Sequence, residues 1–207
     1  MRRAPFGFAE RVGADGTLFD GGFAGAATAE SVAAELARAE SEGMRVLHRR
    51  RIPASALERR QIARLPSDAD PASGMRAEGV IDHLVVTRGA VWAVSVPATA
   101  GRPQRHVGGR FLHPRVETLT VGGADQSELL DQMQAHIDRI EARFPELPVR
   151  GALCFAEERS LFGGSFSVRG VDVVAPGRLV KLLHSTDAGR IDVASAASLL
   201  GHAFPAA

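Results

Sequence analysis

The chain has 207 residues, a formal net charge of +1 and 45% hydrophobic residues. These values are typical of one globular domain, and they exclude a global electrostatic attraction to nucleic acid or membrane. Cys154 is the one cysteine, which excludes a disulfide framework and a cysteine-based zinc cluster. No stretch reaches the roughly 18 apolar residues of a membrane span or carries the apolar run of a signal peptide, so we expect a cytoplasmic protein without membrane contact.

The chain begins with a segment that predicts little regular structure. Residues 1–26 are rich in glycine and alanine and are broken by turn signals, which predicts a flexible N-terminal leader. Val32, Leu36 and Ala39 then recur at helical spacing. This pattern predicts a helix over residues 27–43.

A short strand and a long loop follow that helix. Residues 44–48 predict the strand, which leads into a run of three arginines. Residues 53–79 hold three of the 11 prolines and many small polar residues. We interpret residues 53–79 as a loop insertion, with a composition that favours disorder, inside one domain over residues 27–205.

Two hairpins are predicted next. Residues 80–87 and 90–96 are almost continuously apolar, which predicts two strands covered on both faces and joined by a tight turn at residues 88–89. Residues 105–113 alternate around a glycine pair, which predicts a second hairpin with a two-residue turn at 108–109.

The last part of the chain alternates helices with strands. The further predicted elements are a helix over residues 125–144, a strand over 149–156, a split strand region over 165–175, and helices over 176–184 and 192–204. The order of all these elements predicts an α/β fold, with a central mixed β-sheet flanked by helices.

Six segments carry a family pattern through their order and spacing. They are RVLHRRRIP (45–53), IDHLVV (81–86), GRP (101–103), HPRVETLTVGG (113–123), GALCFAE (151–157) and LFGGSFSVRGVDVV (161–174). Together they resemble the nuclease-related (NERD) domain of actinobacterial proteins. That resemblance implies a restriction-endonuclease-like PD-(D/E)xK core and phosphodiester hydrolysis assisted by Mg²⁺.

The resemblance also assigns the catalytic positions. Asp82 matches the strand aspartate that would hold the metal, and Glu30 or its neighbour Ala29 matches the helix glutamate. Ser95 stands where the second carboxylate belongs, and Pro97 stands where the lysine belongs. We therefore interpret Asp82 and Glu30 as the remnant of a catalytic site, with Asp82 as a weak metal ligand.

Two functional hypotheses follow from the presence of Ser95 and Pro97 at those positions. The first is a degenerate nuclease-related domain that binds nucleic acid or regulates, without phosphodiesterase activity and without a cofactor. The second is an active nuclease using Mg²⁺ or Mn²⁺, in which Lys181 or Arg102 supplies the cation. Lys181 is the one lysine of the chain, and its apolar helical surroundings favour a solvated helix face instead. A protein-interaction module is a third alternative.

The sequence holds one local cluster of positive charge. Arg49, Arg50 and Arg51, with Arg59, Arg60 and Arg64, place six arginines within sixteen residues. With Arg102 they are our candidates for contacts to the phosphates of DNA or RNA. A solvated, partly disordered loop is the alternative interpretation of this cluster, and a protein is the alternative partner.

Other candidate ligands and nucleophiles have structural interpretations. We expect His83 to be a packed histidine, His106 and His113 to be surface positions, and His136 to lie on a solvated helix face. Cys154 lies in an apolar strand, which favours a buried and unreactive thiol.

Overall fold

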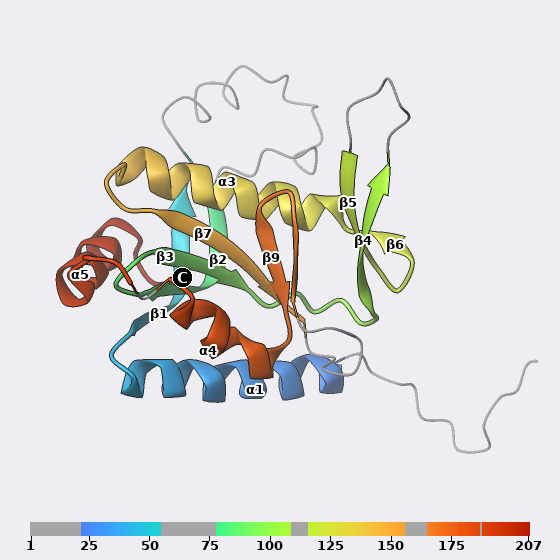
Figure 1. Cartoon of the computed structure of the whole chain (residues 1–207), viewed down its shortest axis with the longest axis horizontal. Helices are drawn as coiled ribbons and strands as arrows, with labels where there is room; N and C mark the ends of the chain where they lie inside the picture. Colours follow the sequence, from blue (N-terminus) through green and yellow to red (C-terminus); the bar gives the residue numbers. More distant parts are fainter. Residues whose placement is uncertain (1–21, 55–77, 109–115, 156–164, 187) are drawn as a thin grey trace, which may run out of the picture.

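Helices cover both faces of a central six-stranded sheet, and a three-stranded sheet stands at one side (Figure 1). The computed structural model describes residues 22–54, 78–108, 116–155, 165–186 and 188–207. In chain order the elements are α1 (Gly22–Ser41), β1 (Arg45–Pro53), β2 (Glu78–Val86), β3 (Val91–Ser95), β4 (Pro103–Gly108), β5 (Val116–Val121), β6 (Ala124–Asp125), α3 (Ser127–Arg143), β7 (Val149–Cys154), β8 (Phe166–Val168), β9 (Val171–Val174), α4 (Pro176–His184) and α5 (Val193–Ala203). The predicted α/β class is confirmed.

The large sheet has the order β1-β2-β3-β7-β9-β8 and mixes both strand directions. β2 is antiparallel to β1 and β3, whereas β3, β7 and β9 are parallel, and β8 returns antiparallel to β9. The start of β2 therefore lies at the same end of the sheet as the ends of β3 and β7. That end carries the predicted catalytic positions.

Two hydrophobic clusters, one on each face, hold the layers together. α3 packs on one face, and α1 and α4 pack on the other (Figure 1). Buried residues of α5 belong to the cluster on the α3 face. In β3 the four residues from Val91 to Val94 are all fully buried, as expected for a central strand covered on both faces. Cys154 is also fully buried, and burial raises the pKa of its thiol to about 12. The prediction of an inert thiol is consistent with this environment.

The turn between β2 and β3 fixes the register of the central hairpin. The buried hydroxyl of Thr87 accepts hydrogen bonds from the N–H groups of Gly89 (3.3 Å) and Ala90 (3.1 Å). A Cβ atom at Gly89 would overlap the carbonyl oxygen of Thr186, so only glycine fits there. The resulting register pairs His83 with Val94 and makes residues 82 and 95 the next pair.

Three local predictions need correction. α1 begins at Gly22, five residues before the predicted start, within the segment interpreted as the leader. β1 continues through the arginine run to Pro53, because β2 pairs with this run on one side and the carboxy-terminal residues pair with it on the other. Gly108 pairs with Val116, so the partner of β4 is β5 and no two-residue turn forms at 108–109.

Candidate functional site

A hydrogen-bonded pair, Asp82 and Ser95, marks the site at the start of β2 and the end of β3. The Ser95 hydroxyl donates to Asp82 Oδ2 over 2.8 Å, and the backbone N–H of Val96 donates to the same oxygen over 2.8 Å. Both side chains are partly buried. The structure thus brings together Asp82 and Ser95, the two positions that the sequence resemblance predicts to be the strand aspartate and the second carboxylate position.

His136 lies on the side of α3 that faces the sheet, and not on a solvated helix face as predicted. Its pKa is lowered to about 4, chiefly by burial and also by the nearby charge of Arg139, while the charge of Asp82 opposes this shift. A Cβ atom on Gly79 in β2 would overlap the His136 ring, so glycine makes room for it. Position 136 lies three residues after buried Met133, and this helical spacing was the signal in the sequence.

The lowered pKa of His136 predicts a loss of stability in mild acid. The His136 ring of the folded state resists protonation down to about pH 4, whereas in the unfolded chain it takes up the proton near the ordinary histidine pKa of 6.5. The contribution of the neutral His136 ring to the unfolding free energy is therefore fully present above pH 6.5. It is lost as the pH falls from 6.5 toward 4. After allowance for partial exposure, we expect the unfolding free energy to drop by about 1 kcal/mol more from pH 7 to pH 5 in the native chain than in His136→Gln. Urea unfolding at both pH values measures this, and equal drops in the two proteins would contradict it.

A second histidine pair lies across β1 and β2. His48 pairs directly with His83, and their Nδ1 atoms are 2.9 Å apart, with the two rings perpendicular. His48 is exposed and His83 is partly buried. Burial lowers the pKa of His83 to about 4, the charge of His48 adds to this, and the charge of Asp82 opposes it. His83 is thus packed, as predicted, but its ring has a specific polar partner.

The arginine triplet, residues 49–51, runs along β1 beside this site. Arg49 lies between the His48–His83 and Arg50–Ile81 pairs, which places it opposite Asp82, and its φ of 43° is in the left-handed region. Arg49 and Arg51 are exposed, and Arg50 is partly buried. The C-terminal residues bond to the other side of β1, where the N–H of Arg51 donates to the Pro205 carbonyl over 2.9 Å.

Among the described residues, Lys181 lies away from Asp82, on the other side of the sheet. Glu30 lies in α1, and Lys181 is exposed on α4, and both helices pack on the sheet face opposite α3. Arg102 is exposed just before β4, and Pro97 is partly buried beyond the end of β3. Arg59, Arg60, Arg64 and His113, the side chain of Glu30, and most of the predicted insertion lie outside the described residues. His106 is exposed on β4, as predicted.

One of three comparisons with known proteins gave a match. The sequence model of the family described as "Nuclease-related domain" (NERD) matches residues 24–156, which is more than half of the chain. The chain belongs to the NERD family. Searches of curated proteins and of solved structures gave no match. The six-stranded mixed sheet with its flanking helices accordingly forms the nuclease-like core of this NERD domain.

The polar groups around Asp82 are a poor match for a resident magnesium ion. Mg²⁺ prefers an octahedron of oxygen ligands anchored by carboxylates, and Ser95 offers only a neutral hydroxyl. Asp82 Oδ2 already accepts two hydrogen bonds. Within the described part of the chain, no group of three or more His, Cys, Asp or Glu side chains is placed to hold a metal.

No helix among the described residues has the length and apolarity needed to cross a membrane.

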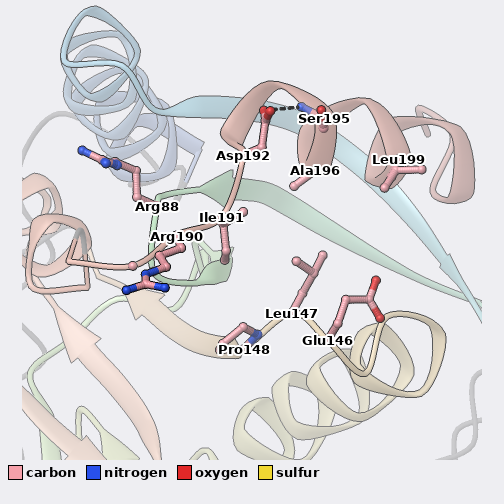
Figure 2. Close-up of a pocket in the computed structure, with 12 residues that line it drawn as sticks. Arg88, Glu146, Leu147, Pro148, Arg190, Ile191, Asp192, Ser195, Ala196 and Leu199 are labelled. Carbon is pink, nitrogen blue, oxygen red and sulfur yellow. Dashed lines mark hydrogen bonds between the residues drawn. The ribbon is translucent and has the colours of Figure 1, made fainter.

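A groove at the opposite end of the sheet is a separate feature of this NERD domain (Figure 2). Its volume is about 510 Å³, and it lies where the β2–β3 turn meets the segments before β7 and α5. Its lining residues are Arg88, Gly89, Glu146, Leu147, Pro148, Gly189, Arg190, Ile191, Asp192, Ser195, Ala196 and Leu199. Two arginines and two acids leave the lining without a dominant charge. It begins six residues, or about 20 Å, along β2 from Asp82, so it does not extend the site.

Proposed function

We propose that this NERD domain binds nucleic acid, or regulates through such binding, without cleaving phosphodiester bonds. The observation that carries the proposal is the hydrogen bond from Ser95 to Asp82. A hydroxyl occupies the position at which we place the second carboxylate of the family, and it donates to Asp82, the strand carboxylate that would hold the metal. Without a bound cation, no group at this position lowers the pKa of an attacking water.

The missing lysine is the second support for a non-catalytic role. A lysine at position 97 would stabilise the charge that develops on the phosphate, whereas proline has neither a cation nor a backbone donor. Lys181 is exposed on α4, across the sheet from α3. Arg102 holds its proton too tightly for base chemistry and is better suited to grip phosphate oxygens.

The arginine triplet supports nucleic acid as the ligand. Its strand lies directly beside β2, so Arg49 and Arg51 present exposed positive charge next to Asp82. Arg139 on α3 extends the basic region, since its Nη1 donates to the carbonyl of Ile52 in β1 over 3.5 Å. Asp82, which we interpret as a former catalytic residue, and the arginines of β1 are therefore neighbours. A phosphate backbone that crosses the site would need this arrangement.

Neutralising the triplet should weaken binding and reduce its salt dependence. Each phosphate contact to duplex DNA contributes about −0.9 to the slope of log K against log salt. Arg49→Gln with Arg51→Gln should therefore reduce the magnitude of that slope by about 1.8 for duplex DNA and weaken binding roughly tenfold. Fluorescence anisotropy with labelled single- and double-stranded DNA and RNA, at several salt concentrations, measures both quantities. Arg143→Gln with Arg178→Gln removes the same charge from exposed positions elsewhere and serves as the matched control.

A cleavage assay decides between the proposal and the active-nuclease alternative. The same nucleic acids are incubated with Mg²⁺ or Mn²⁺, beside an Asp82→Ala variant. We expect binding without cleavage. Cleavage that Asp82→Ala abolishes would overturn the proposal in favour of an active nuclease with a relocated cation. The absence of both cleavage and binding would overturn it in favour of a protein partner.

A further inference from the structure

The His48–His83 pair has the spacing of two ligands on one metal ion. Imidazole nitrogens bind metals such as zinc at 2.0–2.1 Å, so two nitrogens 2.9 Å apart subtend an angle of about 90° at a shared ion. An angle near 90° is that of neighbouring ligands in square-planar, tetragonal or octahedral coordination, and it is narrower than a tetrahedral site requires.

The fold keeps these two nitrogens together. His48 and His83 are direct partners in the β1–β2 ladder, and the flanking pairs Leu47–Leu84 and Arg50–Ile81 fix the register on both sides. Leu84 and Ile81 are fully buried, which anchors the strand that carries His83. The His48 side chain is exposed, so its ring has freedom to turn its Nδ1 lone pair toward an ion that lies off the line between the two nitrogens.

We propose that His48 and His83 form a two-imidazole site for a divalent late transition metal, with water completing the coordination. Imidazole is a ligand for nickel, copper and zinc, and the 90° angle favours the tetragonal preference of Ni²⁺ and Cu²⁺. In the metal-bound form both rings coordinate through Nδ1 and carry their proton on Nε2, in place of the hydrogen bond that now joins the two Nδ1 atoms.

This site is chemically distinct from the position of Asp82. Successive residues of a strand point to opposite faces, so Asp82 and His83 project to different sides of β2. Nitrogen ligands select late transition metals, whereas a carboxylate selects magnesium or manganese. Metal binding by the two imidazoles therefore does not depend on whether the NERD domain binds or cleaves nucleic acid.

Titration with Ni²⁺ alone tests the site on the full chain after removal of any histidine tag. Isothermal calorimetry should give one equivalent of Ni²⁺ bound to the native protein. His48→Gln and His83→Gln should each weaken this binding at least tenfold, because each leaves a single imidazole. His106→Gln, an exposed histidine on β4, should bind Ni²⁺ like the native chain.

A second readout covers the case in which His83→Gln fails to fold. Long-range ¹H–¹⁵N spectra of the native histidine rings should show Ni²⁺ broadening the His48 and His83 signals first, with the other rings affected only at higher concentration. Equal binding by native chain and His48→Gln, or first broadening at another histidine, would overturn the proposal. Loss of Ni²⁺ binding in Asp82→Asn, with both imidazoles intact, would overturn it as well, because the metal would then depend on the carboxylate.

Discussion

Replacing Ser95 with aspartate and Pro97 with lysine in one chain should create a Mg²⁺ site beside Asp82. The Ser95 hydroxyl already lies 2.8 Å from Asp82 Oδ2, so a carboxylate at 95 would place two anionic oxygens within reach of one ion. Without metal, the two carboxylates repel each other and lower stability. Bound Mg²⁺ removes that repulsion, so the variant should be stabilised by Mg²⁺ and the native chain should not.

Thermal unfolding with and without MgCl₂ measures this effect. At a Mg²⁺ concentration ten times Kd, binding to the folded state adds about 1.4 kcal/mol to the unfolding free energy. Ser95→Asp with Pro97→Gln is the matched control, because it keeps the new carboxylate and lacks the cation. Both variants should bind Mg²⁺, and any recovered cleavage should require the lysine. If the double variant folds but is not stabilised by Mg²⁺ or Mn²⁺, the catalytic positions have been assigned incorrectly.

Trp92→Ala should cause the largest loss of stability among substitutions in the sheet. The Trp92 side chain is fully buried in β3 within the cluster beneath α1 and α4. Its indole N–H donates to the Thr186 hydroxyl over 2.9 Å, and the Arg150 guanidinium lies 5.6 Å from the ring centre. Removing so large a side chain from a covered layer costs about 3–5 kcal/mol.

Equilibrium urea unfolding measures that loss of stability. Two further variants serve as comparisons. Trp92→Phe keeps most of the ring volume and removes the indole donor, so it should cost less than half as much. Leu199→Ala removes a side chain that is 55% exposed on α5 and should change stability by no more than about 0.5 kcal/mol. A Trp92→Ala loss below about 1 kcal/mol would mean that the layer of α1 and α4 does not pack tightly on β3.

The elements with strong periodicity were predictable from sequence. α4 has the predicted bounds, because Pro176 suits the first turn of a helix. α3 differs by two residues at its start and one at its end, since its apolar spacing is regular over seventeen residues. The β4–β5 pairing was predicted with the wrong partner, because local alternation around two glycines carries no information about a strand that begins at Val116.

Sequence reasoning singled out only those residues of the candidate site that the family pattern includes. Asp82 and Ser95 follow from the pattern, and the register of one hairpin then brings them into contact. His136 was missed because its position depends on how α3 docks on Gly79, which lies 57 residues earlier in the chain. The His48–His83 contact was missed for a similar reason, since it depends on the pairing of strands separated by the segment interpreted as an insertion.

The strand directions of the large sheet place the two tight turns that precede its strands β3 and β9 at one end and Asp82 at the other. The tight turn at 88–89, the loop between α3 and β7 and the turn at 169–170 all join elements at one end. Asp82 lies at the other end of the sheet. Three connections between successive strands leave from that end, namely those from β1 to β2, from β3 to β4 and from β7 to β8. Changes of length or composition in these connections would alter what surrounds Asp82 without disturbing the turns that set the registers. Recognition could therefore diverge between relatives while the scaffold stays the same.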